Sequence, residues 1–160
     1  MVHILIVDDH STSQRLMSFI LQQHQYMTTT AMNGREALEC LAEQSFDLVI
    51  TDLNMPEVNG LELLRQMRNH DRYRSIPVII LTGSVQDHDQ VRAHEAGAIA
   101  FLTKPVGSDE VIATVGQLLA ARHIEDISAL DTPSAPTPES APPNAVKVLG
   151  LRLKKQINVI

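Results

Sequence analysis

The 160-residue chain has room for one domain of ordinary size and a short appendage. Its composition, 44% hydrophobic and 20% charged, is typical of a globular protein, and it shows neither a secretory signal nor an apolar run that could span a membrane. Residues 1–122 carry 15 acidic and nine basic side chains, and this acidic excess with few aromatic residues argues against nucleic-acid binding. The only cysteine, Cys40, cannot form an internal disulfide, which fits a cytoplasmic location.

Ten elements follow one another along the chain, because short apolar runs that predict buried strands alternate with amphipathic stretches that predict helices. In chain order they are a strand at 3–7, a helix at 11–23, a strand at 26–31, a helix at 35–44, a strand at 47–51, a helix at 61–69, a strand at 77–81, a helix at 87–96, a strand at 99–102 and a helix from 109 to about 122. Ser11 or Thr12 is expected to cap the first helix, and Gly97 to close the fourth.

Apolar spacing also predicts which faces of the first three helices are buried. The expected inner residues are Leu16, Met17, Phe19, Ile20 and Leu21 in the first helix, Ala37, Leu38, Leu41 and Ala42 in the second, and Leu61, Leu64 and Met67 in the third. Strict alternation of five strands with five helices implies a doubly wound α/β domain, in which a parallel sheet has helices on both faces.

The character of the chain changes after residue 122, where the predicted domain ends. Residues 123–145 are rich in proline, serine and alanine and predict an extended linker. Residues 146–160 carry four basic side chains and alternate as a strand does, but they are too few for a domain. Three roles stay open for this tail: docking on a partner as an added strand or on an acidic surface, opening a missing domain, or remaining disordered.

Polar residues follow four of the five predicted strands, at the edge where open α/β sheets bind ligands. Asp8 and Asp9 follow the first strand, Asp52 the third, Thr82 the fourth and Lys104 the fifth. Three carboxylates at one edge would repel one another unless a cation lay among them, and Mg²⁺, a hard cation with oxygen ligands, fits best. Lys104 is the only lysine in the first 146 residues, and its compact ammonium suits one carboxylate or one phosphoryl oxygen.

Each of these positions also has a simpler interpretation. Asp8 or Asp9 would serve only as a helix cap, and Thr82 would be an ordinary residue at a strand end. The seven histidines, at positions 3, 10, 24, 70, 88, 94 and 123, lack the spacing of a metal site and are expected on the surface or in helices.

The ordered set of motifs resembles the receiver domain of bacterial two-component response regulators, a CheY-like superfamily. The motifs that carry the resemblance are Asp8-Asp9, Asp52 with Met55-Pro56 and Gly60 behind it, Thr82-Gly83 and Lys104-Pro105. The resemblance covers residues 1–122 and implies a flavodoxin-like sheet with strand order 2-1-3-4-5. It implies a phosphoacceptor switch that catalyses only its own phosphorylation and dephosphorylation, and is otherwise not an enzyme.

The resemblance also implies how the phosphoryl group and the metal are held. Asp52 would accept the phosphoryl group from a sensor histidine kinase or a phosphotransfer protein. Asp8, Asp9, Asp52 and the backbone carbonyl of Asn54 would hold Mg²⁺, for which Mn²⁺ could substitute.

The remaining motif residues are implied to read the phosphorylated state. Lys104 and Thr82 would contact the phosphoryl group, and Thr82 with Phe101 would form the switch. The alternative for Phe101 is an ordinary core residue. The Lys104-Pro105 bond is the expected cis peptide.

The output is expected to be a protein partner, bound through the surface of the fourth helix, fifth strand and fifth helix. A phosphorylation-dependent dimer stays open. Direct DNA binding is not expected, because the residues after 122 are too few for a helix-turn-helix domain behind a linker. Two alternatives are the N-terminal receiver of a truncated larger regulator and a Mg²⁺-dependent aspartyl-phosphate phosphatase, although Asn54, two residues after Asp52, is not the carboxylate that a phosphatase would need.

Overall fold

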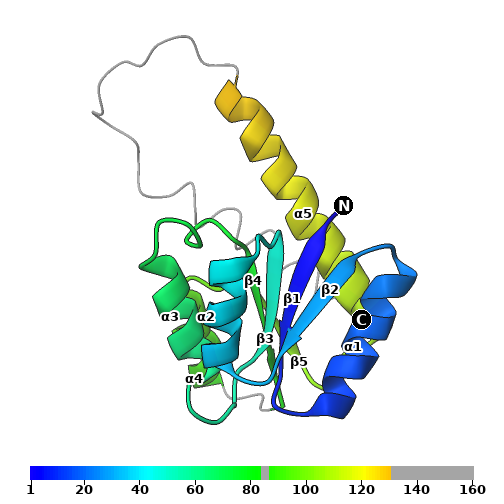
Figure 1. Ribbon diagram of the computed structural model, residues 1–160, viewed down its shortest axis with the longest axis vertical. Coiled ribbons are helices and arrows are strands. Elements are labelled where there is room, and N and C mark those ends of the chain that lie inside the picture. Colours follow the sequence, from blue (N-terminus) through cyan, green and yellow to red (C-terminus); the bar gives the residue numbers. More distant parts are fainter. Residues whose placement is uncertain (84–86, 131–160) are drawn as a thin grey trace. The chain divides into compact units, whose positions relative to one another are not determined.

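The computed structural model describes residues 1–83 and 87–130. Five parallel strands form one sheet in the order β2-β1-β3-β4-β5, which confirms the predicted fold (Figure 1). The strands are β1 (His3–Val7), β2 (Met27–Ala31), β3 (Leu48–Asp52), β4 (Val78–Thr82) and β5 (Ala100–Thr103). The helices are α1 (Ser11–Gln23), α2 (Gly34–Glu43), α3 (Gly60–Arg68), α4 (Asp87–Glu95) and α5 (Ser108–Leu130). None of these helices is long and apolar enough to cross a bilayer.

Side chains along each strand alternate between two buried clusters, one on each face of the sheet. In β1, Leu5 and Val7 belong to the cluster that packs against α2 and α3, whereas Ile4 and Ile6 belong to the cluster that packs against α1 and α5. All four side chains are buried. Because both faces are covered, the strand reads as a continuous apolar run instead of an alternating one.

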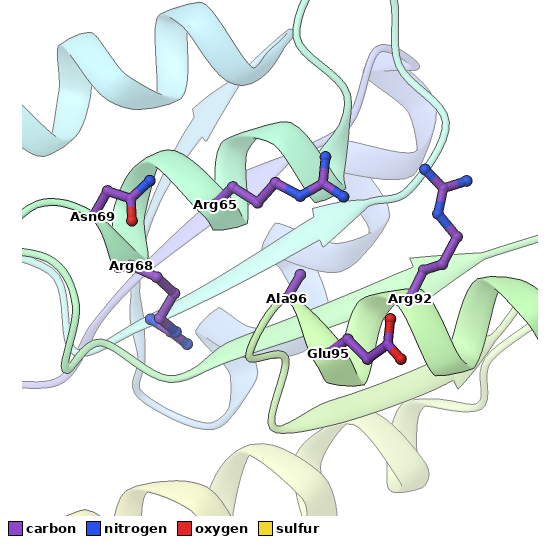
Figure 2. Close-up of a pocket in the computed structure, with 6 residues that line it drawn as sticks. All are labelled: Arg65, Arg68, Asn69, Arg92, Glu95 and Ala96. Atoms are coloured by element: carbon purple, nitrogen blue, oxygen red, sulfur yellow. The ribbon is translucent and has the colours of Figure 1, made fainter.

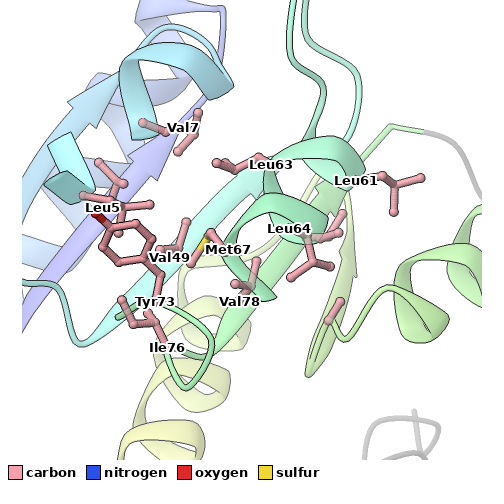
Figure 3. Close-up of a cluster of buried hydrophobic side chains, with 14 of the residues drawn as sticks. Leu5, Val7, Val49, Leu61, Leu63, Leu64, Met67, Tyr73, Ile76 and Val78 are labelled. Atoms are coloured by element: carbon pink, nitrogen blue, oxygen red, sulfur yellow. The ribbon is translucent and has the colours of Figure 1, made fainter. Parts of the chain in front are cut away.

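Helix α3 lies over β3 and β4 and buries the residues that its spacing predicts. Leu61, Leu64 and Met67 are buried, and Figure 3 shows them in the same cluster as Val49 and Val78 of the two strands. This packing fixes the start of α3 close to the end of β3.

The predicted bounds are close to the observed ones, with two instructive differences. β3 begins at Leu48, one residue later than predicted, and the carboxylate of the preceding Asp47 accepts the backbone N–H of His3 at 2.9 Å. α5 continues to Leu130, past the predicted end near residue 122, because the sequence places no glycine or proline there. The predicted tail at 146–160, and the predicted linker from residue 131 on, lie outside the described residues.

The predicted inner face of α1 was too wide. Leu16 and Phe19 are each 61% exposed, and the buried residues of the helix are Gln14, Met17 and Leu21. Five apolar residues within six positions cover more than one face of a helix, so spacing alone cannot say which of them meet the sheet.

Two smaller expectations about helices α1 and α2 were also wrong. His10, and neither Ser11 nor Thr12, is the N-cap of α1, and it makes no side-chain capping bond. Ala42 of α2 is exposed, and Ile20 of α1 is only half-buried.

Gly97 closes α4 in a left-handed conformation with φ of 95°. The Arg68 guanidinium donates to its carbonyl oxygen at 2.9 Å, and a Cβ added at Gly97 would lie 2.9 Å from Arg68 Nε. We predict that Gly97→Ala lowers the free energy of unfolding by about 1–3 kcal/mol, because alanine adopts this conformation with strain and meets Arg68. Urea denaturation measures the change. Gly83→Ala is the control, since open space surrounds Gly83, and equal effects of the two substitutions would contradict the prediction.

Candidate functional site

The carboxyl ends of four neighbouring strands bring the predicted site residues to one edge of the sheet. Asp8 and Asp9 follow β1, Asp52 ends β3, Thr82 ends β4 and Lys104 follows β5. Asp8, Asp52 and Thr82 are buried. Because the four strands are apolar and parallel, the polar residues at their ends come to the same edge, and the sheet sets the spacing between these polar groups.

The ammonium group of Lys104 bridges two of the carboxylates. Its Nζ lies 2.6 Å from Asp52 Oδ2 and 2.9 Å from Asp8 Oδ2. Burial by itself would lower the pKa of Lys104, but hydrogen bonds to Asp52 and Asp8 and the charges of both carboxylates outweigh it and raise the pKa. Lys104 therefore stays cationic near neutral pH, and its ammonium holds two buried carboxylates together.

Lys104 is positioned by the backbone on both sides. Its N–H donates to the carbonyl oxygen of Thr82 at 2.7 Å, so the ends of β4 and β5 are tied beside Asp52. The peptide bond to Pro105 is cis, as expected.

Asp8 is held in place by a residue that hydropathy does not reveal. The buried side chain of Gln14 donates from Nε2 to the carbonyl oxygens of Asp8 and Ala31, both at 2.8 Å. Asp8 Oδ1 accepts the backbone N–H of His10 at 2.8 Å. Gln14 thus links the ends of β1 and β2 to α1. Its only signal in the sequence is a polar residue on the face of α1 that packs against the sheet.

Asp52 is held through its own loop and through α3. Its Oδ1 accepts the backbone N–H of Asn54 at 3.1 Å, while Oδ2 faces Lys104. Gly60 packs so closely that a Cβ there would overlap the backbone oxygen of Asp52. The Asp52 carboxylate therefore sits on a backbone with little freedom to move.

Asp9 differs from the other two aspartates in its contacts. Its Oδ1 exposes less than 1 Å² and has no hydrogen-bond partner among the described residues. The Nδ1 atom of His10 approaches this oxygen to 2.9 Å without hydrogen-bond alignment. A buried oxygen without a donor suits a cation, so the residues fit a divalent metal ion.

One atom each of Asp8, Asp9 and His10 forms a group that could hold such an ion. His10 is exposed, as the sequence predicts for the histidines, and the structure places its ring beside Asp8 and Asp9. The signal was available in the sequence, since His10 directly follows the two aspartates at the end of β1.

Thr82 lies in β4 and Phe101 in β5, the two strands that follow β3 and Asp52 in the order of the sheet. Thr82 is fully buried, and Phe101 is half-buried against the cluster that contains α3. Ile80 pairs with Phe101 and Thr82 with Thr103 in the register of β4 and β5. The two residues are thus close in the sheet, and whether Phe101 moves stays a prediction.

A hollow of about 370 Å³ lies between α3 and α4 and contains none of these residues (Figure 2). Its lining consists of Arg65, Arg68, Asn69, Arg92, Glu95 and Ala96. Arg68 is already committed, since it donates to the carbonyl oxygens of Gly97, Arg74 and Ile76, and burial lowers its pKa. The predicted site residues thus lie at the acidic edge of the sheet and outside this hollow.

The fold and the site together define a class of protein. A doubly wound parallel sheet with aspartates after β1 and β3, threonine at the end of β4 and lysine after β5 describes a domain that takes a phosphoryl group on a carboxylate. Residues 4–116 match the response regulator receiver domain family. The chain belongs to this family, whose members act in two-component signalling as phosphoacceptors.

Several relatives are similar to this chain over most of its length. Polar-differentiation response regulator DivK of Brucella anthropi is 32% identical, over 72% of this chain and 94% of DivK. Protein PilH of Pseudomonas aeruginosa is 34% identical, over 75% of this chain and 99% of PilH. Transcriptional regulatory protein ZraR of Klebsiella oxytoca is 34% identical, but the chain spans only 30% of that protein.

Solved structures show the same fold. Chemotaxis protein CheY4 of Vibrio cholerae is similar with a TM-score of 0.71 at 30% identity, over 74% of this chain and 98% of CheY4. The signal receiver domain of a signal transduction histidine kinase from Syntrophus aciditrophicus has a TM-score of 0.71 at 34% identity, over 88% of this chain and all of that chain.

Proposed function

We propose that this chain is a response regulator in which Asp52 accepts the phosphoryl group of a phosphohistidine, on a sensor histidine kinase or a phosphotransfer protein. The observation that carries the proposal is the double contact of Lys104 Nζ with Asp52 and Asp8. One partly exposed ammonium between two buried carboxylates is arranged to receive negative charge, because it can turn to phosphoryl oxygens as they arrive.

Phosphoryl transfer requires the attacking and leaving atoms to be held in line while charge on the other oxygens is neutralised. A carboxylate oxygen of Asp52 attacks phosphorus, the bond from phosphorus to the donor nitrogen breaks, and an aspartyl phosphate results. Asp8, Asp9, Asp52 and the backbone carbonyl of Asn54 would hold Mg²⁺ or Mn²⁺, which supplies positive charge to the phosphoryl oxygens. The unpartnered Oδ1 of Asp9 supports this assignment.

The switch follows from the neighbours of Lys104. When Lys104 turns to the phosphoryl group, the Thr82 hydroxyl moves toward the same group, and Phe101 packs into the space that Thr82 leaves. The backbone bond from Lys104 N–H to the Thr82 carbonyl supports a coupled movement of these two strand ends. Two packings of one core then differ in population with phosphorylation.

The output is a protein contact through the surface of α4, β5 and α5, in the cytoplasm and without direct DNA binding. In a second form of this proposal, the partner at this surface is another copy of the chain, and phosphorylation controls the dimerisation. The near-complete coverage of DivK and PilH supports a receiver that acts alone. The partial coverage of ZraR supports the alternative, in which the chain is the receiver of a larger regulator.

The test is phosphorylation with acetyl phosphate and Mg²⁺, read by intact mass. We expect the wild-type chain to gain one phosphoryl group and Asp52→Asn to gain none, because the amide is not a nucleophile. Asp71→Asn is the matched control, since the Asp71 side chain is 94% exposed and distant in sequence from every site residue. Equal uptake of the phosphoryl group by the wild type and Asp52→Asn would overturn the proposal. Catalytic release of the phosphoryl group into small-molecule products, with none retained on the chain, would favour the phosphatase alternative.

A further inference from the structure

The ring of His10 places a nitrogen atom beside the carboxylate oxygens of the proposed metal site. Its imidazole is 72% exposed at the rim of the acidic edge, and its Nδ1 lies 2.9 Å from Asp9 Oδ1 and 3.4 Å from Asp8 Oδ1. The position of the ring follows from the chain path, because His10 is the N-cap of α1 and its own N–H is bonded to Asp8.

These separations match those between ligands of a single ion. Two ligand atoms about 2.1 Å from one ion lie about 3.0 Å apart at a right angle and about 3.4 Å apart at the tetrahedral angle. The two distances from His10 Nδ1, 2.9 Å and 3.4 Å, lie close to these two values, and all three ligand atoms lie within 4.8 Å of one another. The carboxylate oxygen nearest to the ring is also the buried Asp9 oxygen that lacks a donor.

We propose that His10 is a metal-selectivity residue, which shifts the preference of this site from Mg²⁺ toward divalent transition-metal ions. This inference rests on the proposed function, because it concerns the same metal. Mg²⁺ binds oxygen and keeps its waters, whereas neutral imidazole nitrogen strengthens binding of the ions later in the first transition row. His10 beside Asp8 and Asp9 therefore raises the preference of this site for such ions over Mg²⁺ beyond what oxygen ligands alone give.

A simple ion pair between His10 and Asp9 is the competing explanation. Such a pair would align an N–H with the carboxylate, yet Asp9 Oδ1 has no hydrogen-bond partner in the described part of the chain. Asp8 Oδ1 is already bonded to a backbone N–H. An ion pair predicts no change in ion preference when His10 is removed, so the two explanations have different outcomes.

The experiment is calorimetric titration of the full chain at one neutral pH with Co²⁺ and with Mg²⁺, for wild type, His10→Ala and His24→Ala. His24 is the control because it is an exposed histidine at the opposite end of α1. We expect His10→Ala to reduce the ratio of Co²⁺ affinity to Mg²⁺ affinity by about tenfold or more, with His24→Ala leaving the ratio as in wild type. The visible absorption of bound Co²⁺ is expected to change in His10→Ala alone, as it loses a nitrogen ligand.

An unchanged affinity ratio and Co²⁺ spectrum in His10→Ala would overturn the inference and leave the proposed function standing. Asp9→Asn separates the two claims. It is expected to weaken both ions, and if it binds both as wild type does, the assignment of the metal to Asp9 fails, and this inference fails with it.

Discussion

Lys104→Met is expected to lower the free energy of unfolding by about 2–3 kcal/mol in the absence of divalent cations. The substitution keeps the length of the side chain and removes its charge. The side chains of Asp8 and Asp52 are 4% and 10% exposed, so they would face each other across one edge of the sheet without the ammonium that now contacts both. Breaking a buried ion pair costs more than this range in dry interiors, but Lys104 is 28% exposed and water replaces part of the loss.

Mg²⁺ is expected to raise the melting temperature of Lys104→Met more than that of the wild type, because the added cation then supplies the missing positive charge. Thermal unfolding with and without Mg²⁺ measures both effects. Arg35→Met is the matched control: the Arg35–Glu39 pair is 3.9 Å long with both side chains mostly exposed, so its loss costs at most about 0.5 kcal/mol. If Lys104→Met without divalent cations were as stable as Arg35→Met, the ammonium would not be the counter-ion of the buried carboxylates.

Gly60→Ala is expected to cost about 3 kcal/mol of stability and to slow phosphorylation of the chain. The added methyl group would overlap the backbone oxygen of Asp52 and crowd Leu53 Cα at 3.1 Å. Neither neighbour is the flexible end of a side chain, so the start of α3 must move away from the end of β3. Because Gly60 N–H also bonds to the Leu53 carbonyl at 3.0 Å, this movement disturbs the loop that carries Asp52.

Chemical denaturation and the rate of phosphorylation by acetyl phosphate measure the two effects of Gly60→Ala. Gly116→Ala in α5 is the control, because it also replaces a helical glycine but has open space around the new methyl group. It is expected to be neutral or to add about 0.5–1 kcal/mol of stability. If Gly60→Ala matched Gly116→Ala in stability and rate, the close approach of α3 to Asp52 would not constrain the acceptor.

Much of the fold could be predicted because buried parallel strands have a clear apolar pattern in the sequence. Runs such as residues 4–7 and 77–81 are apolar throughout, and the polar residues that follow them come together at one edge for topological reasons alone. The contact between Lys104 and Asp52 could therefore be expected before any distance was known.

The parts that could not be predicted depend on packing in three dimensions. Leu16 and Phe19 are as apolar as Met17 and Leu21, and only the placement of α1 on the sheet decides which pair is buried. Gln14 is buried because its amide donates to the carbonyl oxygens of Asp8, directly after β1, and of Ala31, at the end of β2, which hydropathy does not register. His10 directly follows the two aspartates in the sequence, but spacing rules for metal ligands do not predict the orientation of its ring.

The central claim, that Asp52 is the acceptor, is tested most directly by chemical mapping of the phosphorylated residue. Borohydride reduces an aspartyl phosphate to homoserine, so peptide sequencing by mass spectrometry locates the modified carboxylate. After treatment with acetyl phosphate and Mg²⁺, we predict homoserine at position 52 and unmodified aspartate at positions 8 and 9. Homoserine at another aspartate, with position 52 unchanged, would contradict the account.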